Sequence, residues 1–170
     1  MEEIYRSIQD VIHPQMAGDE AASAEERIAI VVHKLQFIPD HQRPKVTYLR
    51  DSLSGHFVQE DYIDQLIRLA GGVPQTDPLE PDFAPEILLV IAPTNMPTLL
   101  SEIPDALSAG FWPETSVVQN NHVYIIHHPE YLQTPGLYPA EEVEVLAEII
   151  NPGYFVYGRQ EDAWLQFNLS

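Results

Sequence analysis

Histidines gather between residues 122 and 130, where they form the densest set of metal-capable side chains in the sequence. His127 and His128 are adjacent, with His122 before them and Glu130 after them. Imidazoles are common metal ligands. Neighbouring side chains of an extended segment point to opposite sides, however, so both imidazoles seldom reach one ion. We therefore expect polar residues at the end of a strand here, rather than a metal ion held by the protein.

The segment from Arg50 to Phe57 carries groups that suit an anionic or aromatic ligand. Arg50 can pair with an anion, and His56 and Phe57 can stack on a ring. The alternative is a solvated loop in which Asp51 or Ser52 makes turn contacts. The residue types fit both interpretations equally.

The sequence lacks the signatures of the common enzyme classes. Ser52, Ser54 and His56 lie close together, but no G-x-S-x-G elbow surrounds them. No Walker motif and no G-x-G-x-x-G occurs, so a nucleotide site is unsupported. The chain has no cysteine, which excludes thiol catalysis and cysteine-ligated metals. The Glu141-Glu142 pair is most simply interpreted as favouring a helix N-terminus. We expect a protein that is not an enzyme.

The net charge and the apolar content of the chain exclude two classes of partner. The 170 residues include 26 acidic and 8 basic side chains, which gives a net charge of −18. Such a charge repels phosphate backbones, so we expect no nucleic-acid partner and no docking on anionic membranes. Hydrophobic residues make up 45% of the chain, enough for a core. No apolar run approaches the roughly 20 residues that span a bilayer, so we expect no membrane insertion.

The predicted elements alternate between helix and strand. Helices are expected over 1–12, 19–38, 59–70, 96–102 and 139–150, and strands over 46–49, 87–92 and 123–126. We expect residues 103–115 to be irregular. We expect 116–118 to form a hairpin with the last strand through Asn120-Asn121. The tail fits either an edge strand or a helix.

This alternation predicts an α/β fold with a mostly parallel sheet of four or five strands and helices on both faces, a three-layer sandwich. We expect one domain over 1–170, with N-terminal helices over 1–38, a core over 44–155 and a tail over 156–170. Ligands of such sheets bind outside the carboxyl ends of the strands. Here those ends are the loops that begin at Arg50, Pro93 and His127. In the second loop, Thr94 and Asn95 are interpreted as helix caps, with ligand contact as the alternative.

Five segments follow one another in an order found in a known family. They are Pro44–Leu49, Tyr62–Gly72 with its closing Leu-Ala-Gly-Gly, Ala84–Ile91, Phe111-Trp112 with Ser116–Ile126, and Leu146–Phe155. Together they resemble the C-terminal lobe of class III substrate-binding proteins of bacterial ABC importers. That family binds ferric siderophores, haem or cobalamin, and relatives bind metal ions. The helix predicted over 19–38 falls where the family places its long helix between lobes.

The resemblance implies a non-enzymatic lobe that binds a small-molecule metal chelate and has no other cofactor. It places the ligand contacts in the three carboxyl-end loops, at Arg50, Asp51, His56, Phe57, Asn95, His127, His128 and Tyr131. It also implies docking on the permease of an ABC importer. The glutamate that docks there in the family has its nearest candidate in Glu80.

Two departures from the family pattern shape the expected function. The N-terminal lobe and the signal peptide have no counterpart in this sequence, and the segment between Gly72 and Ala84 is shortened. One lobe offers half a cleft, so we expect a homodimer that rebuilds a two-lobed cleft. One alternative is a structural or interaction protein that has lost its ligand, and another is a fragment of a longer receptor. The missing signal peptide favours the cytoplasm, whereas the resemblance favours the periplasm.

Overall fold

A computed structural model describes residues 2–51, 59–75, 84–94 and 96–169. The chain forms two compact units, each assembled from three separate stretches. The first unit comprises Met1–Arg43, Glu60–Val73 and Glu130–Gly158, and the second comprises Pro44–Gln59, Pro74–Pro129 and Arg159–Ser170. No helix among the described residues has both the length and the apolar character of a membrane span.

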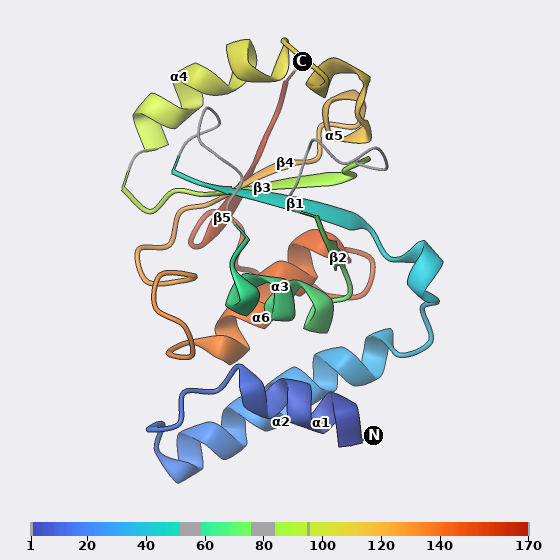
Figure 1. The fold of residues 1–170 in the computed structure, drawn as a ribbon. Helices are drawn as coiled ribbons and strands as arrows, with labels where there is room; N and C mark the ends of the chain where they lie inside the picture. The colour runs from blue at the N-terminus through green and yellow to red at the C-terminus, as the bar shows by residue number, and fades with distance from the viewer. Residues whose placement is uncertain (1, 52–58, 76–83, 95, 170) are drawn as a thin grey trace. The chain divides into compact units, whose positions relative to one another are not determined.

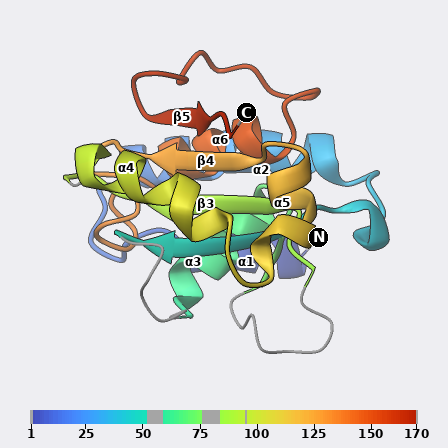
Figure 2. The same ribbon diagram turned by 90° about the horizontal axis from the view of Figure 1, so that it is seen from above.

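The sheet has five strands in the order β2-β1-β3-β4-β5 (Figure 1). Their bounds in chain order are Lys45–Arg50 (β1), Val73–Pro74 (β2), Ile87–Ile91 (β3), Val123–Ile126 (β4) and Trp164–Phe167 (β5). β1, β3 and β4 are parallel, and β5 runs antiparallel to β4. Figure 2 shows β1, β3, β4 and β5 side by side in that order. The α/β fold with a mostly parallel sheet is confirmed, and the tail takes the edge-strand alternative.

The core of the second unit lies on one face of the sheet. All five residues of β3 are apolar and buried, as expected of a central parallel strand. Within this unit, α4 (Met96–Leu107), the 3₁₀ helix η2 (Trp112–Glu114) and α5 (Ser116–Gln119) cover that face (Figure 1). α4 extends beyond the predicted 96–102 because buried Ile103 and Leu107 continue the helical spacing of Leu99. The prediction that residues 103–115 are irregular is therefore wrong in part.

The predicted hairpin through Asn120-Asn121 is wrong, because residues 116–119 form α5. Asn121 has a φ of 56° and follows the end of this helix. The N–H of His122 then donates to the carbonyl of Val117 at 2.9 Å, which satisfies a helix-terminal acceptor. An asparagine in the left-handed region serves both hairpin turns and helix ends, so the residue type alone did not distinguish them.

The first unit is helical. It contains α1 (Glu2–Asp10), α2 (Gly18–Leu35), the 3₁₀ turn η1 (Asp40–Gln42), α3 (Asp61–Leu69) and α6 (Pro139–Ile150). α6 packs against both α2 and α3. The buried residues of α2 are Ala24, Ile28, Val31 and Leu35, which share one helical face. The four α-helices predicted for this unit are confirmed.

Candidate functional site

The carboxyl ends of β1, β3 and β4 meet in one row across the sheet. Arg50 pairs in register with Ile91, and Ile91 pairs with Ile126. Arg50 is partly buried, and Asp51 after it is exposed, with a φ of 64°. The N–H of Asp51 donates to the carbonyl of Ile91 at 2.8 Å, so the chain leaves β1 beside the end of β3. Two of the predicted ligand loops therefore start next to each other.

The two adjacent histidines are tied to the segment that precedes β5. The N–H groups of His127 and His128 both donate to the carbonyl of Ala163, at 3.0 and 3.3 Å. Both side chains are partly buried. His127 directly follows Ile126, so it lies on the same sheet edge as Arg50. Within the described ranges, no three His, Cys, Asp or Glu side chains are grouped so that they could hold a metal ion.

Tyr131 differs from these residues in its surroundings, because it belongs to the first unit. It is 5% exposed, and its ring centroid lies 5.9 Å from that of Tyr138. The structure thus brings Arg50, Asp51, His127 and His128 to one sheet edge. The other predicted site residues, His56, Phe57, Glu80 and Asn95, lie outside the described residues.

A buried carboxylate fixes the loop that contains Tyr131. Glu142, in the first turn of α6, is 1% exposed. It accepts hydrogen bonds from the hydroxyl of Tyr62 at 2.6 Å and from the N–H of Leu132. Burial raises the pKa of Glu142 to about 7, and burial next to this carboxylate also raises the pKa of Tyr62. The helix-terminus interpretation of Glu141-Glu142 missed this role, since only the packed structure shows which of the two glutamates is buried.

Gly136 closes the same loop against the turn between α1 and α2. Its φ is +86°, and its carbonyl accepts from the N–H of His13 at 3.2 Å. A Cβ atom at this position would lie 2.9 Å from the His13 nitrogen, closer than real contacts allow. Glycine is therefore required for two reasons, namely the left-handed backbone conformation and the lack of space for a Cβ atom. The loop is held at Leu132 by α6 and at Gly136 by the α1–α2 turn.

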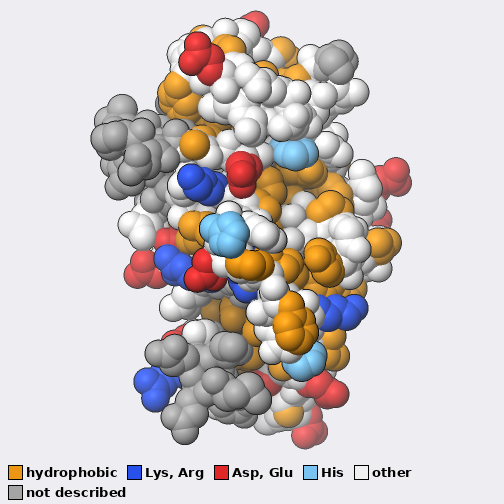
Figure 3. All heavy atoms as spheres, turned by 90° about the vertical axis from the view of Figure 1, so that its right-hand side faces the viewer, with side chains coloured by type: hydrophobic (Ala, Val, Ile, Leu, Met, Phe, Trp, Pro, Cys, Tyr) orange, Lys and Arg blue, Asp and Glu red, His pale blue; other side chains and the backbone are white. Residues whose placement is uncertain are grey.

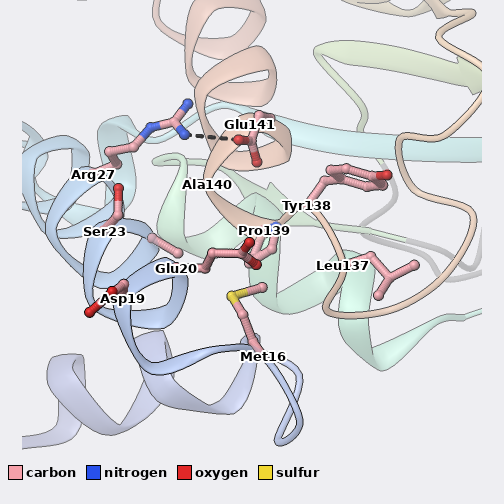
Figure 4. Close-up of a pocket in the computed structure, with 11 residues that line it drawn as sticks. Met16, Asp19, Glu20, Ser23, Arg27, Leu137, Tyr138, Pro139, Ala140 and Glu141 are labelled. Atoms are coloured by element: carbon pink, nitrogen blue, oxygen red, sulfur yellow. Dashed lines mark hydrogen bonds and ion pairs between the residues drawn. The ribbon is translucent and has the colours of Figure 1, made fainter.

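A cavity of about 480 Å³ opens in the first unit between the start of α2 and the start of α6 (Figure 4). Met16 and Leu137 give it apolar walls, and Arg27 and Glu141 are polar. Arg27 donates to Glu141 at 2.8 Å, the dashed line in Figure 4, and also to Glu144. The hydrogen bond to Glu144 does most to hold the pKa of Arg27 above its usual value. Two carboxylates thus neutralise Arg27, which leaves it little charge for an anionic ligand.

The surface carries charge and apolar groups side by side. On the face shown in Figure 3, acidic side chains are scattered rather than gathered in one patch, and hydrophobic side chains are exposed between them. The first unit exposes several large apolar residues, among them Phe37 at 83% and Val156 at 87%. Single exposed apolar residues are common on protein surfaces, and a contact surface requires several of them in one patch.

Comparisons with known proteins found similarity in structure but not in sequence. No family model matches the chain, and no curated protein matches it. Solved structures of ABC-transporter substrate-binding proteins match it well. IsdE of Staphylococcus aureus, complexed with haem, has a TM-score of 0.62 at 17% identity, over 88% of this chain and 64% of that one.

Two further matches are of the same kind. A substrate-binding protein of Listeria monocytogenes has a TM-score of 0.61 at 18% identity, over 79% of this chain and 58% of that one. A solute-binding protein of Sulfurospirillum deleyianum has a TM-score of 0.58 at 19% identity, over 81% of this chain and 46% of that one.

The chain has the fold of part of an ABC-transporter substrate-binding protein. It spans about half to two thirds of the length of these structures, as expected of a single lobe. All three are binding proteins by description rather than enzymes. The fold expected from the five sequence segments is therefore confirmed.

Proposed function

We propose that the chain is a non-enzymatic ligand-binding module that acts as one lobe of an ABC-importer substrate-binding protein. The observation that carries the proposal is the likeness to such proteins over most of this chain but only part of theirs. The proposed ligand is a metal chelate, namely haem, a ferric siderophore or cobalamin. Haem is included because the similar S. aureus protein was solved in complex with haem.

The proposed contacts lie at the carboxyl edge of the sheet. Arg50 would pair with an acidic group of the chelate, because a guanidinium forms strong charge-assisted hydrogen bonds with carboxylates. Asp51, His127 and His128 follow the ends of β1 and β4 and would supply polar contacts. The contacts proposed from the sequence alone also include Tyr131, which belongs to the first unit, and His56, Phe57 and Asn95, which lie outside the described residues. Glu80 is the proposed contact to the permease.

A single lobe needs a second surface to enclose a ligand, so we include a homodimer in this proposal. Closed two-fold dimers are the commonest oligomers and would supply that surface from an identical chain. Native mass spectrometry separates the possibilities. One ligand per dimer would support a shared cleft, and one ligand per monomer would contradict it.

Direct titration tests the ligand. Haem binding is followed by its Soret band, and ferric siderophores and cobalamin are followed by quenching of Trp112 and Trp164 fluorescence. We expect Arg50→Gln to weaken binding about tenfold, the loss of one charge-assisted hydrogen bond. Arg6→Gln, an exposed position on α1, removes the same charge and should bind like the wild type. Absence of binding by all three ligands, or equal loss in both variants, would contradict the proposal.

A second function, protein interaction without ligand, is favoured by the exposed apolar residues of the first unit. Phe37 and Val156 are mostly exposed, so replacing both with serine should leave stability almost unchanged. Under this function the double variant would lose self-association in sedimentation experiments while the wild type remains dimeric. A wild-type chain that stays monomeric at high concentration would instead contradict self-association.

A further inference from the structure

A second cavity lies in the first unit, where α1, the end of α2, the η1 turn and α3 meet. Its volume is about 670 Å³, within the usual range of small-molecule pockets. It is separate in its lining from the cavity of Figure 4, since the two share no residue. It also contains none of the residues predicted to contact a chelate.

The charge of this cavity is opposite to that of the chain. The whole sequence has only 8 basic side chains against 26 acidic ones, yet Arg43 and Arg68 line this cavity with a single carboxylate, Asp40. Asp40 is fully exposed and lies 3.6 Å from Arg43. An anion in this cavity would lie near two guanidinium groups, although the net negative charge of the chain as a whole repels anions. The cavity is therefore a local site of positive charge.

The two arginines differ in how they are held. Arg43 is anchored by the end of α2, because it donates to the carbonyls of Leu35 at 3.1 Å and Ile38 at 3.4 Å. This fixes its guanidinium before any ligand arrives. Arg68 is exposed on α3, and no carboxylate of the described residues lies within salt-bridge distance of it. Its charge is available to a ligand.

Three apolar residues line the cavity together with its charged groups and the polar Ser7, Gln36 and Gln65. Leu35 is 1% exposed and Leu69 is 8% exposed, and Val32 beside them is partly buried. Apolar side chains combined with polar groups that fix orientation are the usual construction of a small-molecule site. Such a site favours a ligand with a charged head and an apolar body.

We propose that this cavity binds a small organic carboxylate, with its head between Arg68 and Arg43 and its apolar body against Leu35 and Leu69. A guanidinium matches the planar, two-oxygen geometry of a carboxylate. A singly charged head suits this chain better than a doubly charged phosphate, since the net charge of −18 repels the second charge more. The site is independent of the chelate-binding function proposed above.

The test uses the full chain and hexanoate, with binding followed by the amide NMR signals of residues 32–43 and 65–69. Hexanoate should shift these signals, and butyrate should bind more weakly by a factor of about four for each methylene removed. Arg68→Gln should weaken hexanoate binding about tenfold. Arg6→Gln removes the same charge at a position that does not line the cavity. This variant should bind hexanoate like the wild type.

Three comparisons can overturn the proposal. Hexanamide, which has the same body without the charge, would contradict an anion site if it bound as tightly as hexanoate. Inorganic phosphate at equal affinity would contradict the apolar part of the site. Equal weakening by Arg68→Gln and Arg6→Gln would mean that net charge, rather than this cavity, controls binding.

Discussion

The hydroxyl of Tyr62 on α3 lies 2.6 Å from the buried carboxylate of Glu142 on α6. The same carboxylate accepts the N–H of Leu132, so one acidic group joins two helices and the loop before α6. A buried carboxylate is tolerated only when hydrogen bonds replace the water it loses. These contacts explain why a glutamate is found among apolar neighbours, and they make its protonation a determinant of stability.

The pKa of Glu142, raised from 4.5 to about 7, predicts how stability changes with pH. A folded-state pKa above the unfolded value means that the folded chain retains a proton that the unfolded chain has lost. The contribution of Glu142 is therefore fully present below about pH 4.5 and is lost as the pH rises through about 7. Its size is up to about 3 kcal/mol. Glu142→Gln should flatten this part of the stability profile.

Denaturant unfolding at several pH values between 4.5 and 8 measures this effect. Glu26→Gln is the matched control, because Glu26 is exposed on α2. The control should follow the wild-type profile. A wild-type slope that survives in Glu142→Gln would show that other groups carry the pH dependence.

Tyr62→Phe should lower the free energy of unfolding by about 2 kcal/mol near neutral pH. The change leaves the buried carboxylate without one of its donors, and hydrogen bonds to charged groups contribute about 1.5–3 kcal/mol. Tyr154→Phe removes a hydroxyl from a residue that is 56% exposed and should have almost no effect. Chemical denaturation compares the two. Similar losses in both variants would contradict a special role for the Tyr62 hydroxyl.

Gly136→Ala should destabilise the chain by more than about 1 kcal/mol. Alanine is strained at a φ of +86°, and its methyl group would lie 2.9 Å from the backbone nitrogen of His13. Gly18→Ala is the contrasting change, since nothing lies within 4 Å of its added Cβ and it begins α2. That variant should be neutral or slightly more stable. Thermal unfolding measures both, and a neutral Gly136→Ala would show that the loop moves to accept a side chain.

Asn121 offers a test of the helix end that replaced the predicted hairpin. Its φ of 56° suits glycine and asparagine, and its Oδ1 accepts the N–H of Leu169 at 3.1 Å. Asn121→Gly keeps the conformation and should cost less than about 1 kcal/mol. Asn121→Val loses both features and should cost about 2 kcal/mol or more. Equal unfolding free energies for the two variants would contradict a left-handed residue at this position.

The sequence predicted the elements whose pattern depends on local spacing. β3 was recognisable because its apolar run is short and lies between Pro85 and Pro93. α2 was recognisable because Ala24, Ile28, Val31 and Leu35 keep one helical face. α5 was missed because four residues are too few to display a helical period, and Val117-Val118 favour a strand in isolation.

The candidate site was predictable only in part. The carboxyl ends of parallel strands lie at one edge of a sheet, so the approach of Arg50 to the start of the β3–α4 loop could be expected. The Tyr62–Glu142 contact could not, since its partners are 80 positions apart and several acidic residues offered equivalent choices. The cavity with Arg43 and Arg68 likewise depends on the packing of α1, α2 and α3, which no local pattern encodes.

The division of each compact unit into three stretches of chain has a consequence for synthesis. The first unit lacks α6 until residue 150 has been made, and the second lacks β5 until residue 167. Each unit is therefore complete only when its last stretch of chain has been made. A domain made of one continuous stretch can instead fold as soon as that stretch emerges from the ribosome. Contacts between stretches so far apart in sequence require large loops to close, so folding should be slow.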